Sequence, residues 1–205
     1  MPVTRQYGTS YFNGTTAVAG RLTTTDGVAS GTAKVVGGRA YTSTAASTAI
    51  SNVTAETAFS TYYTIPANTL KAGTLVKVRW QGIATATNST DTLAVKAYLA
   101  TDLTAGAIVG TVLATHAATD VADNNVFQGE YELIIRTAGA SGTMVGCGTQ
   151  KSVPAAEGTA TFKDDILAST TVDTTVAQIV CVTATWSVQS SSNSVRLDFL
   201  RVEIY

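Results

Sequence analysis

The chain has 205 residues with 13 basic and 14 acidic side chains, so its formal net charge at pH 7 is −1. Only 13% of the residues are charged and 45% are hydrophobic, and the sequence contains neither an apolar run of 18 residues nor a basic, apolar leader. These features argue against nucleic acid or a membrane as a partner and against secretion. We therefore expect one domain, with or without an appendage, that is made and stays in a cytoplasm.

Residues 1–55 predict an N-terminal arm rather than a domain. Glycines interrupt each apolar run before it reaches strand length, and residues 42–57 are mostly alanine, serine and threonine. A segment with so few large side chains cannot build its own core, so it orders on another surface or remains a soluble tail. We favour the arm. Its candidate contact residues are Tyr7, Tyr11, Phe12, Leu22, Val35, Val36 and Tyr41.

Residues 56–205 predict an all-β domain. Three apolar side chains alternate with three polar ones over residues 76–81, which is typical of a strand with one buried face. The same alternation recurs further along the chain, and a change of its phase near Phe199 and Leu200 predicts a β-bulge. About eight such strands with short turns predict an antiparallel, jelly-roll-like β-sandwich with an extended N-terminal arm.

The same alternation divides the side chains between core and surface. Trp80 and Trp186 each end an apolar row, so we predict that both are buried. Ile83, Ile134 and Ile179 fall on the outward phase, and a surface with few charges favours their burial against a neighbouring copy. We therefore expect an obligate oligomer with closed symmetry.

Side chains suited to catalysis are sparse. His116 is the one histidine of the sequence, and we interpret it as a surface residue rather than a member of a catalytic triad. Glu130 and Glu132 share a predicted strand face, and Asp164 and Asp165 lie in a predicted turn. We interpret both pairs as solvated carboxylates rather than as the acid and base of a glycosidase. We expect no catalytic residue and no enzymatic activity.

Cofactor and metal sites are not expected either. The acidic and amide side chains of residues 120–125 lack the ordered spacing of a calcium loop, which favours a plain turn. Cys147 and Cys181 are too few for a zinc site, and we interpret them as two buried free thiols.

Turn and core residues of the domain carry a resemblance to phage virion proteins. The segments concerned are residues 64–80, which begin with T-I-P-A-N-T-L-K-A-G-T-L, and residues 88–99, 120–143 and 174–198. Together they resemble a β-sandwich module of tailed bacteriophage virions, and the chain is most similar to the jelly-roll decoration, or cement, proteins of icosahedral heads. The resemblance covers about residues 57–205 and leaves the arm outside.

This resemblance implies a structural role without catalysis. A decoration protein is made in the host cytoplasm and is located on the capsid surface of the virion, where a homotrimer clamps capsid subunits and stabilises the head. The expected partners are other copies of the chain and the major capsid protein, with the arm residues as candidate contacts. A chain that begins near Thr54 is then expected to fold and oligomerise but to bind heads weakly.

Two other functions remain open. One is a tail-fibre or head-fibre module that adheres to host surface glycans, for which Tyr62 and Tyr63 are the candidate aromatic side chains. The other is a glycan-degrading enzyme built on Glu130 and Glu132. The number of copies in each virion separates the first alternative from decoration, because fibres are present in few copies.

Overall fold

The computed structural model describes residues 28–30, 33–35, 38–86, 90–121, 124–153 and 160–205. The chain divides into two compact units, Met1–Val36 and Gly37–Tyr205. In the first unit, β1 (Val28–Ser30) and β2 (Ala33–Val35) form a two-stranded antiparallel sheet. The strands β3 to β14 all belong to the second unit.

The second unit consists of two antiparallel sheets. The seven-stranded sheet has the order β12 (Thr161–Val172), β11 (Gly142–Val153), β10 (Asn125–Thr137), β7 (Leu75–Thr85), β14 (Ser194–Ile204) and β3 (Gly38–Thr42), and β4 (Ile50–Ser51) also pairs with β14. The five-stranded sheet has the order β5 (Thr57–Ala58), β13 (Gln178–Trp186), β8 (Thr92–Asp102) and β9 (Val109–Asp120), and β6 (Tyr63–Ile65) also pairs with β13. No helix long and apolar enough to cross a membrane occurs in the described part of the chain.

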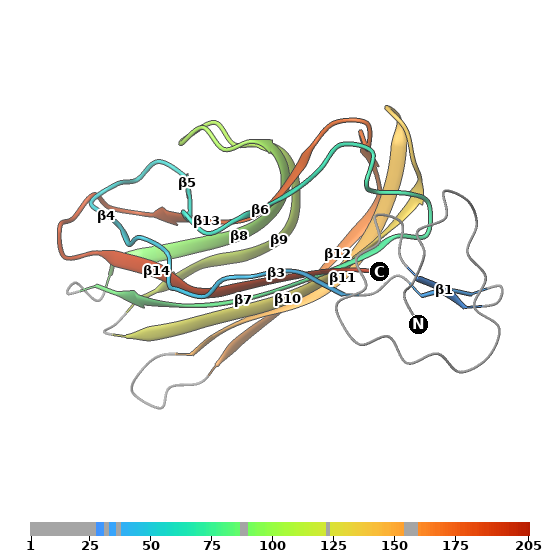
Figure 1. Ribbon diagram of the computed structural model, residues 1–205. Helices are drawn as coiled ribbons and strands as arrows, with labels where there is room; N and C mark the ends of the chain where they lie inside the picture. The colour runs from blue at the N-terminus through green and yellow to red at the C-terminus, as the bar shows by residue number, and fades with distance from the viewer. Residues whose placement is uncertain (1–27, 31–32, 36–37, 87–89, 122–123, 154–159) are drawn as a thin grey trace, which may run out of the picture. The chain divides into compact units, whose positions relative to one another are not determined.

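The two sheets pack face to face around one hydrophobic core (Figure 1). Apolar side chains of both sheets point into this core, among them Val78 and Leu133 from the seven-stranded sheet and Val95 and Val182 from the five-stranded sheet. Strands β8 and β9, β10 and β11, and β11 and β12 are neighbours in one sheet, whereas the other connections between consecutive long strands cross between the sheets. The all-β, antiparallel sandwich expected from the alternation is confirmed.

Residues 38–51 belong to the sandwich. β3 and β4 both pair with β14. Serine hydroxyls of this segment form further hydrogen bonds with the backbone of β14. The Ser47 hydroxyl accepts a hydrogen bond of 2.9 Å from the backbone N–H of Leu197, and the Ser43 hydroxyl accepts one of 2.9 Å from the N–H of Leu200. The small hydroxyl residues of this segment therefore complete the hydrogen bonding of a sheet edge.

Apolar contacts also hold this segment. The ring of Tyr41 stacks on Tyr63 with centroids 5.6 Å apart, and Ile50 is buried. The boundary between the units, after Val36, therefore lies earlier than the boundary near residue 55 expected from the sequence. The physical reason is that an extended segment with few large side chains can obtain its hydrogen bonds by pairing with the free edge of β14.

Both tryptophans are core residues, as predicted, because Trp80 and Trp186 are each 1% exposed. The predicted bulge is also present, since the register between β14 and β7 shifts between Leu197 and Phe199. Odd-numbered residues of β14 before this shift and even-numbered residues after it face the core. The change of phase in the sequence therefore marks a real irregularity of the strand.

Three aromatic side chains of the seven-stranded sheet each lie over a glycine of the neighbouring strand. Register pairs Phe127 with Gly82, Trp80 with Gly129, and Tyr131 with Gly148. A Cβ atom added at Gly129 would lie 2.1 Å from Cζ2 of Trp80, and one added at Gly82 would lie 2.2 Å from Cζ of Phe127. These glycines are therefore needed for the close approach of the rings and not for backbone freedom.

Side chains of β12 join the two sheets along one side of the sandwich. The backbone N–H of Thr115 on β9 donates to Asp165 Oδ1 over 3.3 Å, and the Lys163 ammonium donates to the carbonyl of Thr115. Asp165 also accepts a bond of 2.9 Å from Gln150 Nε2 and pairs with Lys163 at 2.7 Å. Inward charges of this kind also protect an edge strand from pairing with other chains.

Two expectations about this region were wrong. Asp164 and Asp165 lie in strand β12 and not in a turn, with Asp164 exposed and Asp165 turned toward β9. His116 is buried, with 6% of its surface exposed, and not a surface residue. The first error arises because polar residues that face inward, as Asp165 does, do not give the alternation by which a strand is recognised.

Candidate functional site

The outward side chains of the seven-stranded sheet align in rows across the strands, because alternate residues face outward and the register places them level. We name three of these the first, second and third polar rows, and a fourth the apolar row. The first polar row is Glu203, Lys77, Glu132, Cys147 and Ile166; the second is Arg201, Arg79, Glu130, Thr149 and Asp164; the third is Phe199, Gln81, Gln128, Lys151 and Phe162; the apolar row is Tyr205, Leu75, Ile134 and Val145.

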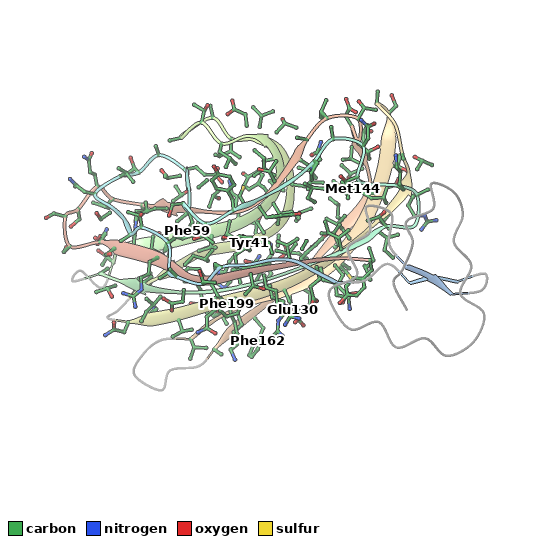
Figure 2. All side chains as sticks on the ribbon, in the orientation of Figure 1. Tyr41, Phe59, Glu130, Met144, Phe162 and Phe199 are labelled. Atoms are coloured by element: carbon green, nitrogen blue, oxygen red, sulfur yellow. The ribbon has the colours of Figure 1, made fainter. Side chains whose placement is uncertain are left out.

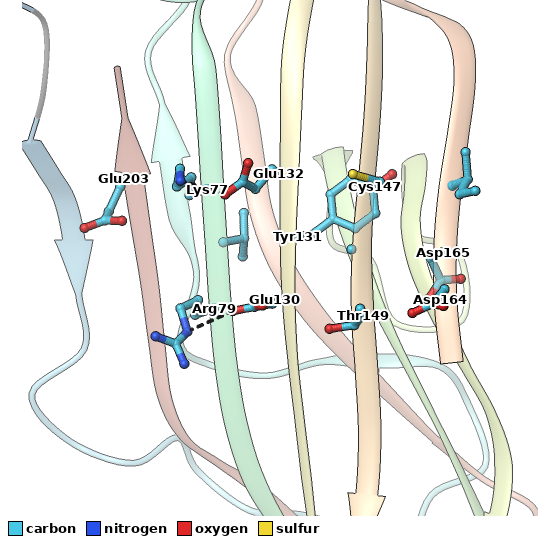
Figure 3. Close-up of a pocket in the computed structure, with 13 residues that line it drawn as sticks. Lys77, Arg79, Glu130, Tyr131, Glu132, Cys147, Thr149, Asp164, Asp165 and Glu203 are labelled. Atoms are coloured by element: carbon cyan, nitrogen blue, oxygen red, sulfur yellow. Dashed lines mark ion pairs between the residues drawn. The ribbon is translucent and has the colours of Figure 1, made fainter. Parts of the chain in front are cut away.

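Ion pairs connect glutamates of β10 with cations of β7 in the first two rows, and Figure 3 marks the pair between Arg79 and Glu130. Lys77 Nζ lies 2.6 Å from Glu132 Oε1, and Arg79 Nε lies 3.5 Å from Glu130 Oε2. The hydrogen bond with Glu132 raises the pKa of Lys77 above its ordinary value. The prediction that Glu130 and Glu132 share one strand face is confirmed, and each carboxylate faces a cation of β7. Since these pairs are exposed to solvent, they contribute little to stability.

The side chains of the polar rows line a hollow on the outer surface of the seven-stranded sheet. Its larger part, of about 620 Å³, lies over the first and second rows, and its smaller part, of about 280 Å³, lies over the second and third. Arg79, Glu130 and Thr149 line both parts, so the two are continuous across the face of the sheet. In Figure 3 the side chains of β7, β10, β11 and β12 lie next to each other around the larger part.

The third polar row has an aromatic ring at each end. Phe162 on the edge strand β12 is 74% exposed, and Lys151 Nζ lies 6.0 Å from the centroid of its ring. Phe199 on β14 is partly exposed, and the amides of Gln81 and Gln128 lie between the two rings in the register. Figure 2 shows Phe162, Phe199 and Glu130 on the outer side of the seven-stranded sheet.

The apolar row exposes large side chains beside the hollow. Ile134 is 43% exposed and Tyr205 is 39% exposed, and Ile166, at the end of the neighbouring first polar row, is 84% exposed. Of the three isoleucines expected to face outward, Ile134 is therefore exposed, whereas Ile83 and Ile179 are half-buried. Ile179 packs against a cluster of its own chain that includes Tyr98.

The two cysteines differ in environment, so the prediction of two buried thiols is correct for Cys181 and wrong for Cys147. Cys181 is fully buried in β13, and burial raises the pKa of its thiol to about 12. Cys147 is an exposed free thiol of the first polar row, between Glu132 and Ile166. Because the thiolate is the reactive form, Cys181 is expected to be inert near neutral pH.

A second polar cluster lies on the outer face of the five-stranded sheet. Glu56 accepts a hydrogen bond of 2.7 Å from the Thr183 hydroxyl and forms an ion pair of 3.0 Å with Lys96 Nζ. The ammonium of Lys96 also lies 3.4 Å from the Tyr98 hydroxyl. Burial alone would raise the pKa of Glu56, but the hydrogen bonds from Thr183 and Lys96 outweigh it and lower this pKa. Through Glu56, which directly precedes β5, these contacts hold this part of the chain against β8 and β13.

We expect Glu56→Gln to lower the free energy of unfolding by about 1 to 2 kcal/mol at pH 7, because the amide retains less of the charge-assisted bonding. A carboxyl with a lowered pKa stabilises the folded state above its unfolded pKa of 4.5, and this contribution is lost as the pH falls through the folded value. Urea unfolding at pH 7 and pH 3 checks this expectation. An equal difference between wild type and variant at both pH values would contradict it.

The described residues contain no group of three or more histidine, cysteine, aspartate or glutamate side chains placed to hold a metal ion. In the turn after β9, the Asn125 amide donates a hydrogen bond of 3.2 Å to the carbonyl of Asp120, and Asn124 has a positive φ of 60°.

The predicted contact residues of the arm have different positions in the chain. Tyr41 packs on the core of its own sandwich. Val35 is the last residue of β2. The other predicted contacts, Tyr7, Tyr11, Phe12, Leu22 and Val36, lie outside the described residues.

The aromatic residues considered for a glycan site also differ in position. Tyr62 is 44% exposed, whereas Tyr63 is half-buried against Tyr41. Phe162 and Phe199, at the ends of the third polar row, were missed. The alternation of Phe162, Asp164 and Ile166 with inward residues is the sequence signal that marks β12, and the assignment of a turn at Asp164 concealed it.

No protein-family model matches the chain, and no curated protein is significantly similar to it. The function proposed for it therefore depends on the residues and geometry of the sandwich and on the resemblance described for residues 57–205.

Proposed function

We propose that the protein is a structural virion protein, a decoration or cement protein that binds an icosahedral phage head as a homotrimer and stabilises it by clamping subunits of the major capsid protein. The observation that carries this proposal is the exposed apolar surface formed by Ile134, Tyr205 and Ile166 on the outer face of the seven-stranded sheet. The resemblance of residues 57–205 to phage decoration proteins supports the trimer and the capsid surface as its location.

The physical argument concerns the cost of leaving this surface in water. Exposed apolar side chains that lie together favour association, at roughly 25 cal/mol for each Å² of apolar area removed from water. The side chains stand on paired strands of a sandwich, so they do not need to be ordered on binding. A rigid apolar surface beside polar rows is suited to a fixed contact with a neighbouring subunit.

The oligomer is expected to dissociate in the variant Ile134→Glu/Ile166→Glu. Charges introduced at both positions would have to be buried unpaired in the contact, whereas in the monomer they remain solvated. Light scattering should therefore give the trimer mass for the wild-type chain and the monomer mass for the variant. Val188→Glu is the matched control, because Val188 is 48% exposed outside the proposed contact, and it should remain trimeric.

The two cysteines provide a second measurement of the same contact. Cys147 is the register partner of Ile166, so it should react with iodoacetamide faster in the double variant than in the wild type, whereas Cys181 should stay unmodified in both. A wild-type chain that scatters light as a monomer, or a double variant that keeps the mass and the Cys147 reactivity of the wild type, would contradict the proposed contact.

A further inference from the structure

We infer that the third polar row is a binding site for a neutral oligosaccharide. This ligand site is separate from the apolar contact of the proposed trimer, because Phe162 and Ile166 are four residues apart along β12, or about 13 Å. A saccharide site here also provides the chemistry needed for adhesion to host glycans, the alternative that the sequence left open.

The first argument is the order of side chains along the row. Phe162 and Phe199 stand at its two ends, on β12 and β14, which are four strand spacings apart and therefore separated by about 19 Å. A flat ring packs against the C–H face of a sugar, and the ring of Phe162 is 74% exposed at the edge of the sheet. Two rings at this separation fit an oligosaccharide better than a single sugar.

The second argument is the hydrogen-bonding capacity between the rings. The side-chain amides of Gln81 and Gln128 each offer both donors and acceptors, and Lys151 adds a further donor. Sugar hydroxyls are also both donors and acceptors, so they match amides in either orientation. Aromatic surface combined with a few polar groups is the usual composition of a small-molecule site.

The third argument is charge. Lys77, Arg79 and Lys151 line the hollow together with five carboxylates, those of Glu130, Glu132, Asp164, Asp165 and Glu203. Lys77 and Arg79 are already paired with glutamates of β10. The hollow therefore offers no surplus positive charge to a phosphate, a sulfate or a nucleic acid. A neutral, hydroxyl-rich ligand is the class that this lining favours.

The fourth argument is that the site exists before the ligand binds. Its side chains stand on β7, β10, β11, β12 and β14, and the hollow continues from the third row over the first two. Side chains on paired strands need little reorganisation, so less of the binding free energy is lost to ordering.

The test is binding of the full chain to a printed array of neutral, sialylated and sulfated oligosaccharides, followed by calorimetric titration with the best ligand of the array. We expect retention of neutral oligosaccharides with three or more sugars. Phe162→Ala should weaken the affinity about tenfold or more, and Phe162→Tyr, which keeps the ring, should restore most of it. The control is Tyr62→Ala, which removes an exposed aromatic ring outside the hollow and should bind as the wild type does.

Because Phe162 is 74% exposed, its truncation should leave the fold and the oligomer mass unchanged. Likewise, the single variant Ile134→Glu, which changes a residue of the proposed trimer contact that does not line the hollow, should still bind the oligosaccharide. These two results separate a failure of the saccharide site from a failure of the proposed trimer. The inference would be overturned if the chain retained no neutral oligosaccharide on the array, or only sulfated or sialylated ones. It would also be overturned if Phe162→Ala bound the ligand with the same affinity as the wild type.

Discussion

A chain that begins at Gly37 is expected to melt within a few degrees of the full chain, whereas one that begins at Thr54 should be much less stable. The difference lies in β3 and β4, which pair with β14 and bring Tyr41 and Ile50 onto the core. Burial of an isoleucine contributes about 1.5 to 3 kcal/mol, and the stack of Tyr41 on Tyr63 contributes about 0.5 to 1.5 kcal/mol.

The shorter chain should therefore lose at least about 2 kcal/mol, which corresponds to a fall in melting temperature of roughly 4 to 8 °C or more. Thermal unfolding followed by circular dichroism measures this fall. The sequence alone predicted that a chain beginning near Thr54 would still fold, because residues 1–55 were treated as one arm. Equal melting temperatures for the two shortened chains would support the prediction from the sequence and would show that β3 and β4 do not contribute to the folded core.

The second large effect concerns Trp80 and the glycine under its ring. Trp80→Ala should lower the free energy of unfolding by about 3 to 5 kcal/mol, because the side chain is buried at the centre of the core. Gly129→Ala should also be destabilising, since its Cβ would lie 2.1 Å from Cζ2 of the indole. Urea unfolding of both single variants measures these effects.

The double variant Trp80→Ala/Gly129→Ala distinguishes a specific contact from two independent losses. Removal of the indole leaves room for the new methyl group, so Gly129→Ala should cost little in this background, and the two changes should be clearly non-additive. Trp186→Ala is the control: it should be about as destabilising as Trp80→Ala, but additive with Gly129→Ala because Trp186 lies in the other sheet. Additive losses for Trp80 and Gly129 would show that the ring does not occupy the space above the glycine.

The strands of the sandwich could be predicted from the sequence wherever one face of the strand is exposed to solvent and the other is buried. Residues 76–81 alternate cleanly because Val78 and Trp80 face the core while Lys77 and Arg79 face solvent. The phase change near Phe199 identified the bulge for the same reason. In such strands the side-chain period of two determines both the element and its buried face.

The candidate site could be predicted only in part. Glu130 and Glu132 were placed on one strand face, but their partners on β7 and the aromatic ends of the third polar row depend on the register between strands distant in sequence. The strand β12 was missed because Lys163 and Asp165 face inward and bind the backbone of β9. Such inward polar contacts require the second sheet to be in place, and the periodicity of one segment does not reveal them.

The central claim, that the protein decorates a phage head, is tested most directly by adding the full chain to purified heads that lack it and imaging the particles by cryo-electron microscopy. The proposed function predicts trimers bound at every equivalent position of the shell, each in contact with several major capsid subunits. Heads that remain bare, or that bind only a few copies of the protein, would contradict it.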